Sequence, residues 1–276
     1  MRVRKRYLPP GWYPGDAAQT REAIEGMART LQPGSARGVA GIVPHAGWEF
    51  SGSLALEIFT LLSRNIDTIV IIGGHLGPAD GILCASEEAY ETPLGHLPAD
   101  LELLEALKGS ITLREDRYAD NTVEIQLPFV RHLFPQARAL GLRASPSKDA
   151  ERLGRAIAEC GGKVGRRVAV AGSTDLTHYG TNYGFQPAGR GERARDWVRE
   201  TNDRRFIDSL LAMDADAAIE RAVRERSACS AGGAVASLSF ARERGATRGT
   251  LVRYATSDEV HPSESFVGYA GILYSP

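Results

Sequence analysis

Three short, mainly apolar runs stand out along this chain, at positions 38–43, 67–73 and 167–172. Such runs, without regular polar alternation, are typical of strands that are buried on both faces of a sheet. A further strand is predicted over 137–142. A segment with one apolar face, 149–158, follows it and predicts a helix. The pattern of buried strands and amphipathic helices indicates an α/β fold.

Other elements are predicted as follows: helices over 16–31, 54–62 and 194–211, a loop over 90–96, and closing strands over 250–256 and 266–274. Asp16 and Ser51 stand where the N-caps of the first two helices belong. Residues 7–15 are rich in proline, glycine and aromatics, and we expect them to lie extended over the body, because Trp and Tyr favour burial. No repeat or linker interrupts the pattern, so residues 1–276 are predicted to form a single domain.

Charge and cysteine content restrict the possible partners. The chain has 33 basic and 34 acidic side chains, which gives no overall field for nucleic acid or a membrane surface. Its three cysteines are widely spaced without a CxxC pair, which favours a reducing compartment over a disulfide framework. The basic start is followed by Pro9-Pro10-Gly11, and no apolar run approaches bilayer length. We therefore expect a cytoplasmic protein that binds neither nucleic acid nor membrane.

Two histidines follow predicted strands. Pro44 ends the first strand because it cannot donate to a sheet ladder, so His45 lies at the start of a loop. The second strand runs into Gly73-Gly74-His75. Ligands bind at the carboxyl ends of strands in open α/β sheets, and adjacent parallel strands lie about 5 Å apart. Both imidazoles could therefore reach one metal ion, although each could also be a polar loop residue that only hydrogen-bonds its surroundings.

A third strand end also carries a histidine. The run 167–172 leads into Ser173-Thr174-Asp175-Leu176-Thr177-His178. In a compact loop Asp175 could hydrogen-bond His178, and a carboxylate that orients an imidazole suits general acid/base catalysis. The alternative is an Asp cap beside a surface histidine.

Glu124 lies in the first turn of an otherwise apolar helix. That helix is predicted to start at Asn121 or Thr122 and to contain Pro128. A carboxylate in a first helical turn is favoured by the helix dipole. The functional interpretation is a buried base or a partner for a histidine.

Cys229 lies in a turn of small residues directly before an alanine-rich helix predicted over 234–242. A helix N-terminus lowers the pKa of a thiol, so Cys229 is a candidate nucleophile or thiolate ligand. A buried, inert cysteine is the simpler interpretation, and it is the one we apply to Cys84 and Cys160.

Several of these motifs together resemble the Memo-like family, whose bacterial and archaeal members are called AmmeMemoRadiSam system protein B. The matching segments run nearly from end to end of the chain: Gly11-Trp12-Tyr13-Pro14, Pro44-His45-Ala46-Gly47-Trp48 with Ser51-Gly52, Gly73 to His75, Thr92-Pro93-Leu94-Gly95, Glu124-Ile125-Gln126-Leu127-Pro128-Phe129, Ser173 to Gly180, and Gly268-Tyr269-Ala270-Gly271. The Glu-Ile-Gln-Leu-Pro-Phe and Pro-His-Ala-Gly segments are the most specific.

The resemblance implies a fold and a metal site. The family is similar in fold to the class III extradiol, non-haem iron dioxygenases of the LigB type, which implies a central mixed β-sheet with helices on both sides. The family's ligand set of two histidines and a cysteine would correspond to His45, His75 and Cys229. Asp175 and His178 would line the pocket, with His178 at the position of the dioxygenases' acid/base histidine. The second motif departs from the family pattern, because its histidine is shifted by about one place.

Three hypotheses follow. The first is a metal-dependent, dioxygenase-like oxidoreductase that uses iron or copper on an unknown small molecule, with His178, Asp175 and Glu124 in catalytic roles. The second is a peptide- or anion-binding module, because one family member is proposed to bind a phosphorylated peptide in this cleft. The third is a zinc-dependent hydrolase. The family's association with radical-SAM proteins also implies a possible partner of that type.

Overall fold

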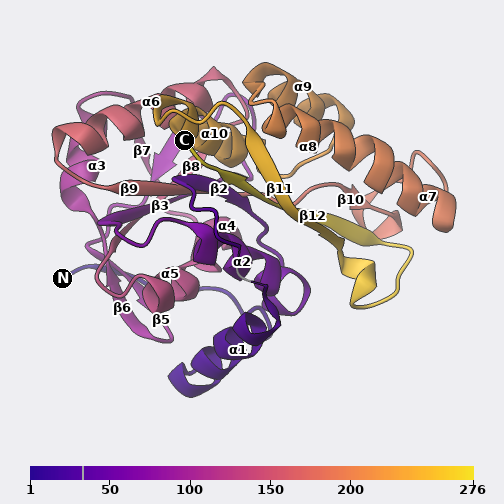
Figure 1. The fold of residues 1–276 in the computed structure, drawn as a ribbon, viewed down its shortest axis with the longest axis horizontal. Coiled ribbons are helices and arrows are strands. Elements are labelled where there is room, and N and C mark those ends of the chain that lie inside the picture. The colour runs from indigo at the N-terminus through magenta and orange to yellow at the C-terminus, as the bar shows by residue number, and fades with distance from the viewer. Residues whose placement is uncertain (33) are drawn as a thin grey trace.

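The apolar runs of the sequence form the centre of a nine-stranded sheet (Figure 1). The computed structural model describes residues 1–32 and 34–276. The strands of this sheet are β2 (Ala40–Val43), β3 (Thr68–Gly73), β4 (Ile82–Cys84), β7 (Arg114–Glu115), β8 (Arg138–Ala144), β9 (Val168–Ser173), β10 (His178–Tyr179), β11 (Gly249–Thr256) and β12 (Phe266–Tyr274). Their order is β10-β12-β2-β9-β3-β8-β4-β7, and β11 pairs with β12.

The sheet is mixed, as the resemblance implied. Strands β2, β9, β3 and β8 are parallel, whereas β12 is antiparallel to β2, and β4 is antiparallel to β8. The expectation that the strands before His45 and His75 are adjacent is wrong, because β9 lies between β2 and β3 and pairs with both. All three strands are parallel, so their carboxyl ends still lie at one edge of the sheet.

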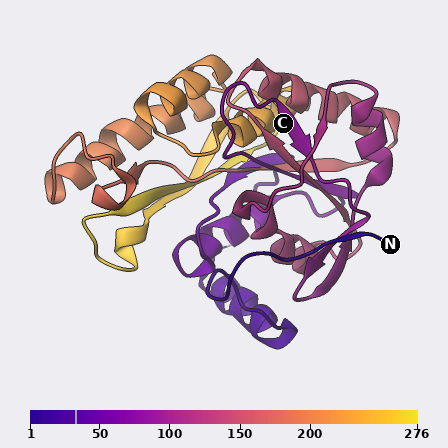
Figure 2. The same ribbon diagram turned by 180° about the vertical axis from the view of Figure 1, so that it is seen from behind.

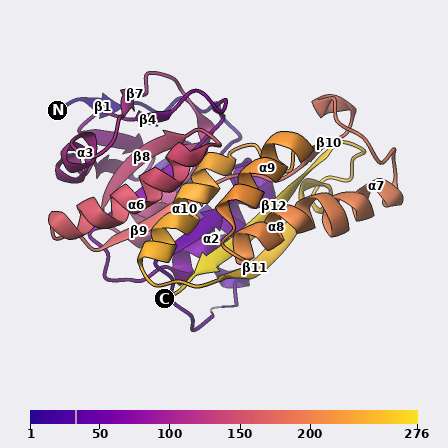
Figure 3. The same ribbon diagram turned by 90° about the horizontal axis from the view of Figure 1, so that it is seen from above.

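Helices cover both faces of this sheet (Figures 1 and 3). On one face lie α3 (Leu101–Lys108), α6 (Lys148–Lys163), α8 (Asp203–Leu211), α9 (Ala215–Glu225) and α10 (Ala231–Glu243); on the other lie α1 (Ala17–Thr30), α2 (Ser53–Leu61), α4 (Asn121–Glu124) and α5 (Leu127–Leu133). In strand β3, residues 69–72 are all apolar because both faces of the strand are buried. Val70 and Ile72 join the core on the first face, and Ile69 and Ile71 join the core on the second.

A small second sheet corrects one prediction. Residues 90–96, predicted as a loop, belong to the hairpin of β5 (Ala89–Thr92) and β6 (Gly95–Pro98), and β1 (Val3–Arg4) pairs with β5. Gly95 has a φ of 97°, which favours glycine, and the hydroxyl of Thr92 donates to its carbonyl at 2.6 Å. Figure 2 shows the N-terminal segment running extended across the body, as the sequence predicted.

Two helix starts also differ from expectation. Ser51 does not cap α2, because a π-helical turn, Trp48–Gly52, precedes that helix and the Ser51 hydroxyl donates to the carbonyl of Ala46. The helix predicted over 194–211 consists of α7 (Glu192–Trp197) and α8, joined by another π-helical turn. That turn ends at Asn202, whose side chain reaches Thr177 at 2.8 Å and supports the loop before His178.

Within the described part of the chain, no helix combines the length and apolar character that crossing a membrane requires.

Candidate metal centre

His45 is held at the end of β2 by contacts on every side. Its backbone amide donates to Asp175 Oδ1 at 2.7 Å, and its Nδ1 lies 3.2 Å from Ser173 Oγ at the end of β9. Gln126 donates from Nε2 to the carbonyl of Pro44 at 2.7 Å. The imidazole is almost completely buried, with 2% of the residue exposed. These contacts fix the ring with Nε2 directed toward Cys229.

His75 reaches the same place from β3, across the intervening strand. Its ring centroid lies 5.0 Å from that of His45, with the two planes nearly perpendicular at 86°. Its Nδ1 lies 3.0 Å from Asp120 Oδ2. His75 has a left-handed backbone with φ of 56°, so the histidine shifted along the sequence still points its imidazole into the site.

Cys229 enters from the turn before α10. Its backbone amide donates to the carbonyl of Asp175 at 3.2 Å, and Ser230 donates to Thr174 Oγ1 at 3.1 Å. Its Sγ lies 3.2 Å from His45 Nε2. One ligand atom from each of His45, His75 and Cys229 lies within 4.8 Å of the other two. The three ligand candidates from the sequence are therefore brought together.

Cys229 is placed to be a thiolate. Burial alone would raise the pKa of its thiol, but the neighbouring His45 and His75 lower it to about 6. For His75, burial alone would lower the pKa of the imidazole, but Asp120 and Cys229 raise it, to about 10. An anionic sulfur between two imidazoles is a suitable donor set for a cation.

In the metal-free chain, alkylation of Cys229 by iodoacetamide is expected to reach half its maximal rate near pH 6. An ordinary thiol would do so near about pH 8.5, because only the thiolate attacks. His45→Ala should raise this midpoint, and His96→Ala, which changes an exposed histidine of β6, should leave it in place. Mass spectrometry over a pH series gives the rates, and a wild-type midpoint at the ordinary value would contradict the thiolate assignment.

Asp175 and His178 lie at the site but are not joined as predicted. Asp175 accepts from the His45 amide, and His178 Nδ1 lies 3.1 Å from the carbonyl of Leu176. A carbonyl can only accept, so Nδ1 of His178 carries the proton and Nε2 is its acceptor. Burial raises the pKa of Asp175 to about 6 despite the lowering effect of the His45 amide. Asp175 therefore supports the His45 loop, and His178 is oriented by the backbone.

Glu124, predicted as a base or a histidine partner, is bonded to the N-terminal segment instead. Its carboxylate accepts from the backbone amides of Tyr7 and Leu8 at 2.9 and 3.0 Å, and from the Tyr13 hydroxyl at 2.8 Å. Both oxygens are used to hold the N-terminal segment.

Glu124→Ala is therefore expected to release that segment while leaving metal content unchanged. The amides of Tyr7 and Leu8 would lose their acceptor, and hydrogen exchange at both should become at least about tenfold faster, since a lost hydrogen bond costs about 1.5–3 kcal/mol when one partner is charged. Exchange detected by NMR and metal analysis of the same sample check this. Loss of metal with unchanged exchange would restore Glu124 to the site.

A cleft of about 680 Å³ opens beside the site, with His45 and His75 in its lining. Its other lining residues include Trp12 from the N-terminal segment, Phe50, His178, Tyr183 and His261.

Sequence analysis missed Asp120, which contacts His75 and is also the N-cap of α4, in place of Asn121 or Thr122. An Asp before an apolar helix signals a cap, but nothing local shows its contact with His75.

Fold and site together define an α/β protein with a His-His-Cys centre at the carboxyl edge of a mixed sheet. The chain belongs to the Memo-like family, because the model of the family described as "Memo-like protein" matches residues 5–273. A MEMO1 family protein of Thermococcus onnurineus is 33% identical over 290 residues, which cover 99% of each chain. Another from Pyrococcus abyssi is 34% identical over 271 residues, covering 91% of this chain and 92% of its own.

A solved structure adds evidence for the fold alone. The crystal structure of the uncharacterized protein JW3007 from Escherichia coli K12 matches with a TM-score of 0.50 at 13% identity. The match covers 84% of this chain and 98% of that chain.

Proposed function

We propose that this chain binds one redox-active metal ion, iron or copper, and acts as a metal-dependent oxidoreductase of dioxygenase type on an organic molecule held in the cleft. The observation that carries the proposal is the convergence of His45, His75 and Cys229. Two imidazoles and a thiolate suit iron, copper or zinc, and the thiolate favours the softer states such as Cu(I). Three protein ligands leave a coordination position open, which is the pattern of catalytic rather than structural sites.

The metal would supply Lewis acidity and electron transfer to molecules bound beside it. The chain's own residues do the rest. His178 lines the cleft with its Nδ1 proton committed to a backbone carbonyl, so its Nε2 can accept a proton from a bound molecule. Trp12, Phe50 and Tyr183 give the cleft apolar walls that hold an organic molecule and displace water.

The two alternatives have less support. The cleft-lining residues in the described part of the chain include no lysine or arginine, and these are the usual partners of a bound phosphate. A zinc hydrolase would need a base beside the metal; of the two candidates from the sequence, His178 lines the cleft, whereas Glu124 is bonded to the N-terminal segment.

Elemental analysis of protein purified without oxygen tests the proposal. We expect close to one iron or copper per wild-type chain, and loss of that metal in His45→Ala but not in the control His96→Ala. Stoichiometric zinc would favour the hydrolase. A wild-type chain that binds none of the three metals, with its fold intact, would overturn the proposal and favour the binding module.

A further inference from the structure

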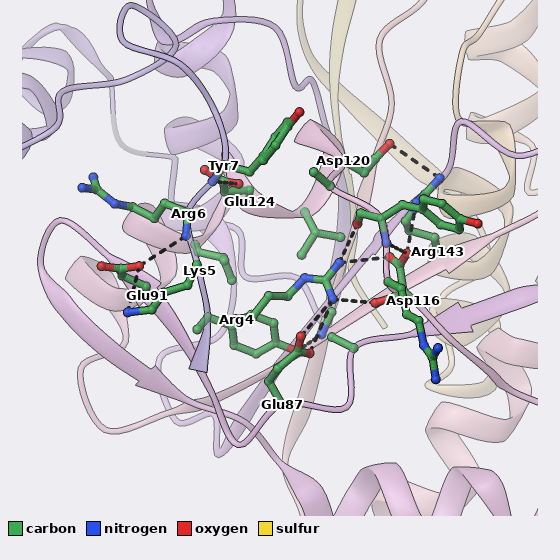
Figure 4. A pocket seen from close by; sticks show the side chains of 18 residues that line it. Arg4, Lys5, Arg6, Tyr7, Glu87, Glu91, Asp116, Asp120, Glu124 and Arg143 are labelled. Atoms are coloured by element: carbon green, nitrogen blue, oxygen red, sulfur yellow. Dashed lines mark hydrogen bonds and ion pairs between the residues drawn. The ribbon is translucent and has the colours of Figure 1, made fainter. Parts of the chain in front are cut away.

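A second cavity, of about 210 Å³, has Asp120 and Arg143 in its lining (Figure 4). Most of its charged side chains pair with one another; Arg6 and Arg117 contact the carbonyl of Gly15 and Glu115 instead. Arg4 contacts Glu87 and Asp116, Lys5 contacts Glu91, and Arg143 contacts Asp116 and Asp120. Glu124 is occupied by the N-terminal amides. Because these charges are neutralised inside the protein, the wall of this cavity is better suited to support its surroundings than to bind a charged ligand.

Asp120 connects this wall to the metal centre. Its Oδ1 caps α4 by accepting from the Thr122 amide at 2.9 Å. Its Oδ2 lies 3.0 Å from His75 Nδ1. A carboxylate can only accept, so Nδ1 carries a proton, and Nε2 is the nitrogen that would face an ion once the ring is neutral.

Arg143 holds both the backbone and the ring partner of His75. Its side chain is only 7% exposed. Its Nε donates to the carbonyl of Gly74 at 2.9 Å, directly before His75, and its Nη2 lies 3.7 Å from Asp120 Oδ2. The remaining terminal nitrogen lies 3.3 Å from Asp116. The planar guanidinium makes these contacts at once, which a lysine ammonium could not reproduce.

This support matters because His75 is in a strained conformation. A left-handed φ of 56° is uncommon for a residue with a Cβ, and such strain persists only where the surroundings fix it. The preceding residue, Gly74, has no room for a side chain, because an added Cβ would lie 2.8 Å from the Cα of Ser230. The turn is thereby held against Ser230, which directly follows Cys229 and precedes α10.

We propose that Asp120 and Arg143 are positioning residues for the metal centre, which together fix the backbone, tautomer and ring orientation of His75. The inference rests on the proposed metal-binding function. The His45 ring is supported differently: its Nδ1 faces the Ser173 hydroxyl, which can donate or accept and so selects no tautomer, and the Asp175 carboxylate lies 3.8 Å from its Nε2. The two imidazoles are thus supported unequally, and His75 depends on a buried carboxylate.

Asp120→Asn tests this role. Asn is as good an N-cap as Asp, so α4 is kept, but its amide presents a donor to Nδ1 and favours the wrong tautomer. We expect the affinity for Zn²⁺, measured by competition with a chelator, to fall by about 10–100-fold. Asp214→Asn makes the same exchange at the N-cap of α9, away from the site, and should bind as wild type. Arg143→Lys should lower the affinity as well.

NMR of ¹⁵N-histidine-labelled, metal-free protein gives a second readout. The wild-type chain should show a downfield Nδ1 proton, assigned with His75→Ala, that is lost in Asp120→Asn and kept in Asp214→Asn. An unprotonated Nδ1 in the wild type overturns the inference whether or not the variants fold. Wild-type Zn²⁺ affinity in Asp120→Asn, with loss in His45→Ala, overturns the positioning role alone. Absence of Zn²⁺, iron and copper binding by the wild-type chain, with the Nδ1 proton present, overturns the proposed function instead.

Discussion

Cys229→Ser is expected to remove the bound metal from the purified protein. The serine side chain has nearly the same shape, but its hydroxyl remains protonated at neutral pH and is a poor donor for soft metals. The pKa of the Cys229 thiol is lowered to about 6, so the wild-type chain offers a thiolate at pH 7 without cost. The loss in Cu(I) or Zn²⁺ affinity should exceed the 10–100-fold that residues outside the ligand set are typically worth.

Cys160→Ser is the matched control for this variant. Cys160 is a buried cysteine of α6 whose Sγ donates to the carbonyl of Ala106 at 3.5 Å, and a serine hydroxyl can make the same bond. Metal content measured by mass spectrometry and affinity measured by chelator competition should match the wild type. If Cys229→Ser kept its metal at wild-type affinity, the thiolate would not be a ligand, and the centre would reduce to two histidines.

The sequence predicted the buried strands well because the signal is local. A strand with a helix layer on each face favours apolar side chains at successive positions, and residues 69–72 show this directly. Strand order has no such local signal. Strand β9 follows β3 by about a hundred residues along the chain, yet it inserts between β2 and β3, and no pattern within either segment records this.

The site divides in the same way. His45, His75 and Cys229 could be predicted because each marks the end of a strand or the start of a helix, and such ends gather at one edge of the sheet. The roles of Asp120 and Glu124 could not. Asp120 caps α4 and Glu124 is its last residue; one faces a histidine and the other faces the N-terminal segment, and only the tertiary structure separates them.

The position of Cys229 depends in turn on how closely α10 packs on the sheet. A Cβ on Gly233 would collide with the carbonyl oxygen of Ile72, and a Cβ on Gly172 would lie 2.6 Å from the carbonyl oxygen of Gly233. Backbone therefore packs on backbone where β3 and β9 meet the first turn of α10. These glycines let the helix approach until the turn that precedes it brings Cys229 to within 3.2 Å of His45.

Gly233→Ala should therefore damage stability and metal binding together. The added methyl meets rigid backbone, so we expect the free energy of unfolding to fall by about 3 kcal/mol, at the upper end of typical overpacking costs. Displacement of the first turn of α10 should move Cys229 and weaken Zn²⁺ binding. Gly162→Ala, at an exposed position of α6 where a Cβ meets nothing within 4 Å, should be neutral or stabilising by up to about 1 kcal/mol. Urea unfolding measures the stability, and chelator competition measures the Zn²⁺ affinity. A Gly233→Ala chain as stable as Gly162→Ala, with wild-type Zn²⁺ affinity, would show that α10 can shift without moving the site.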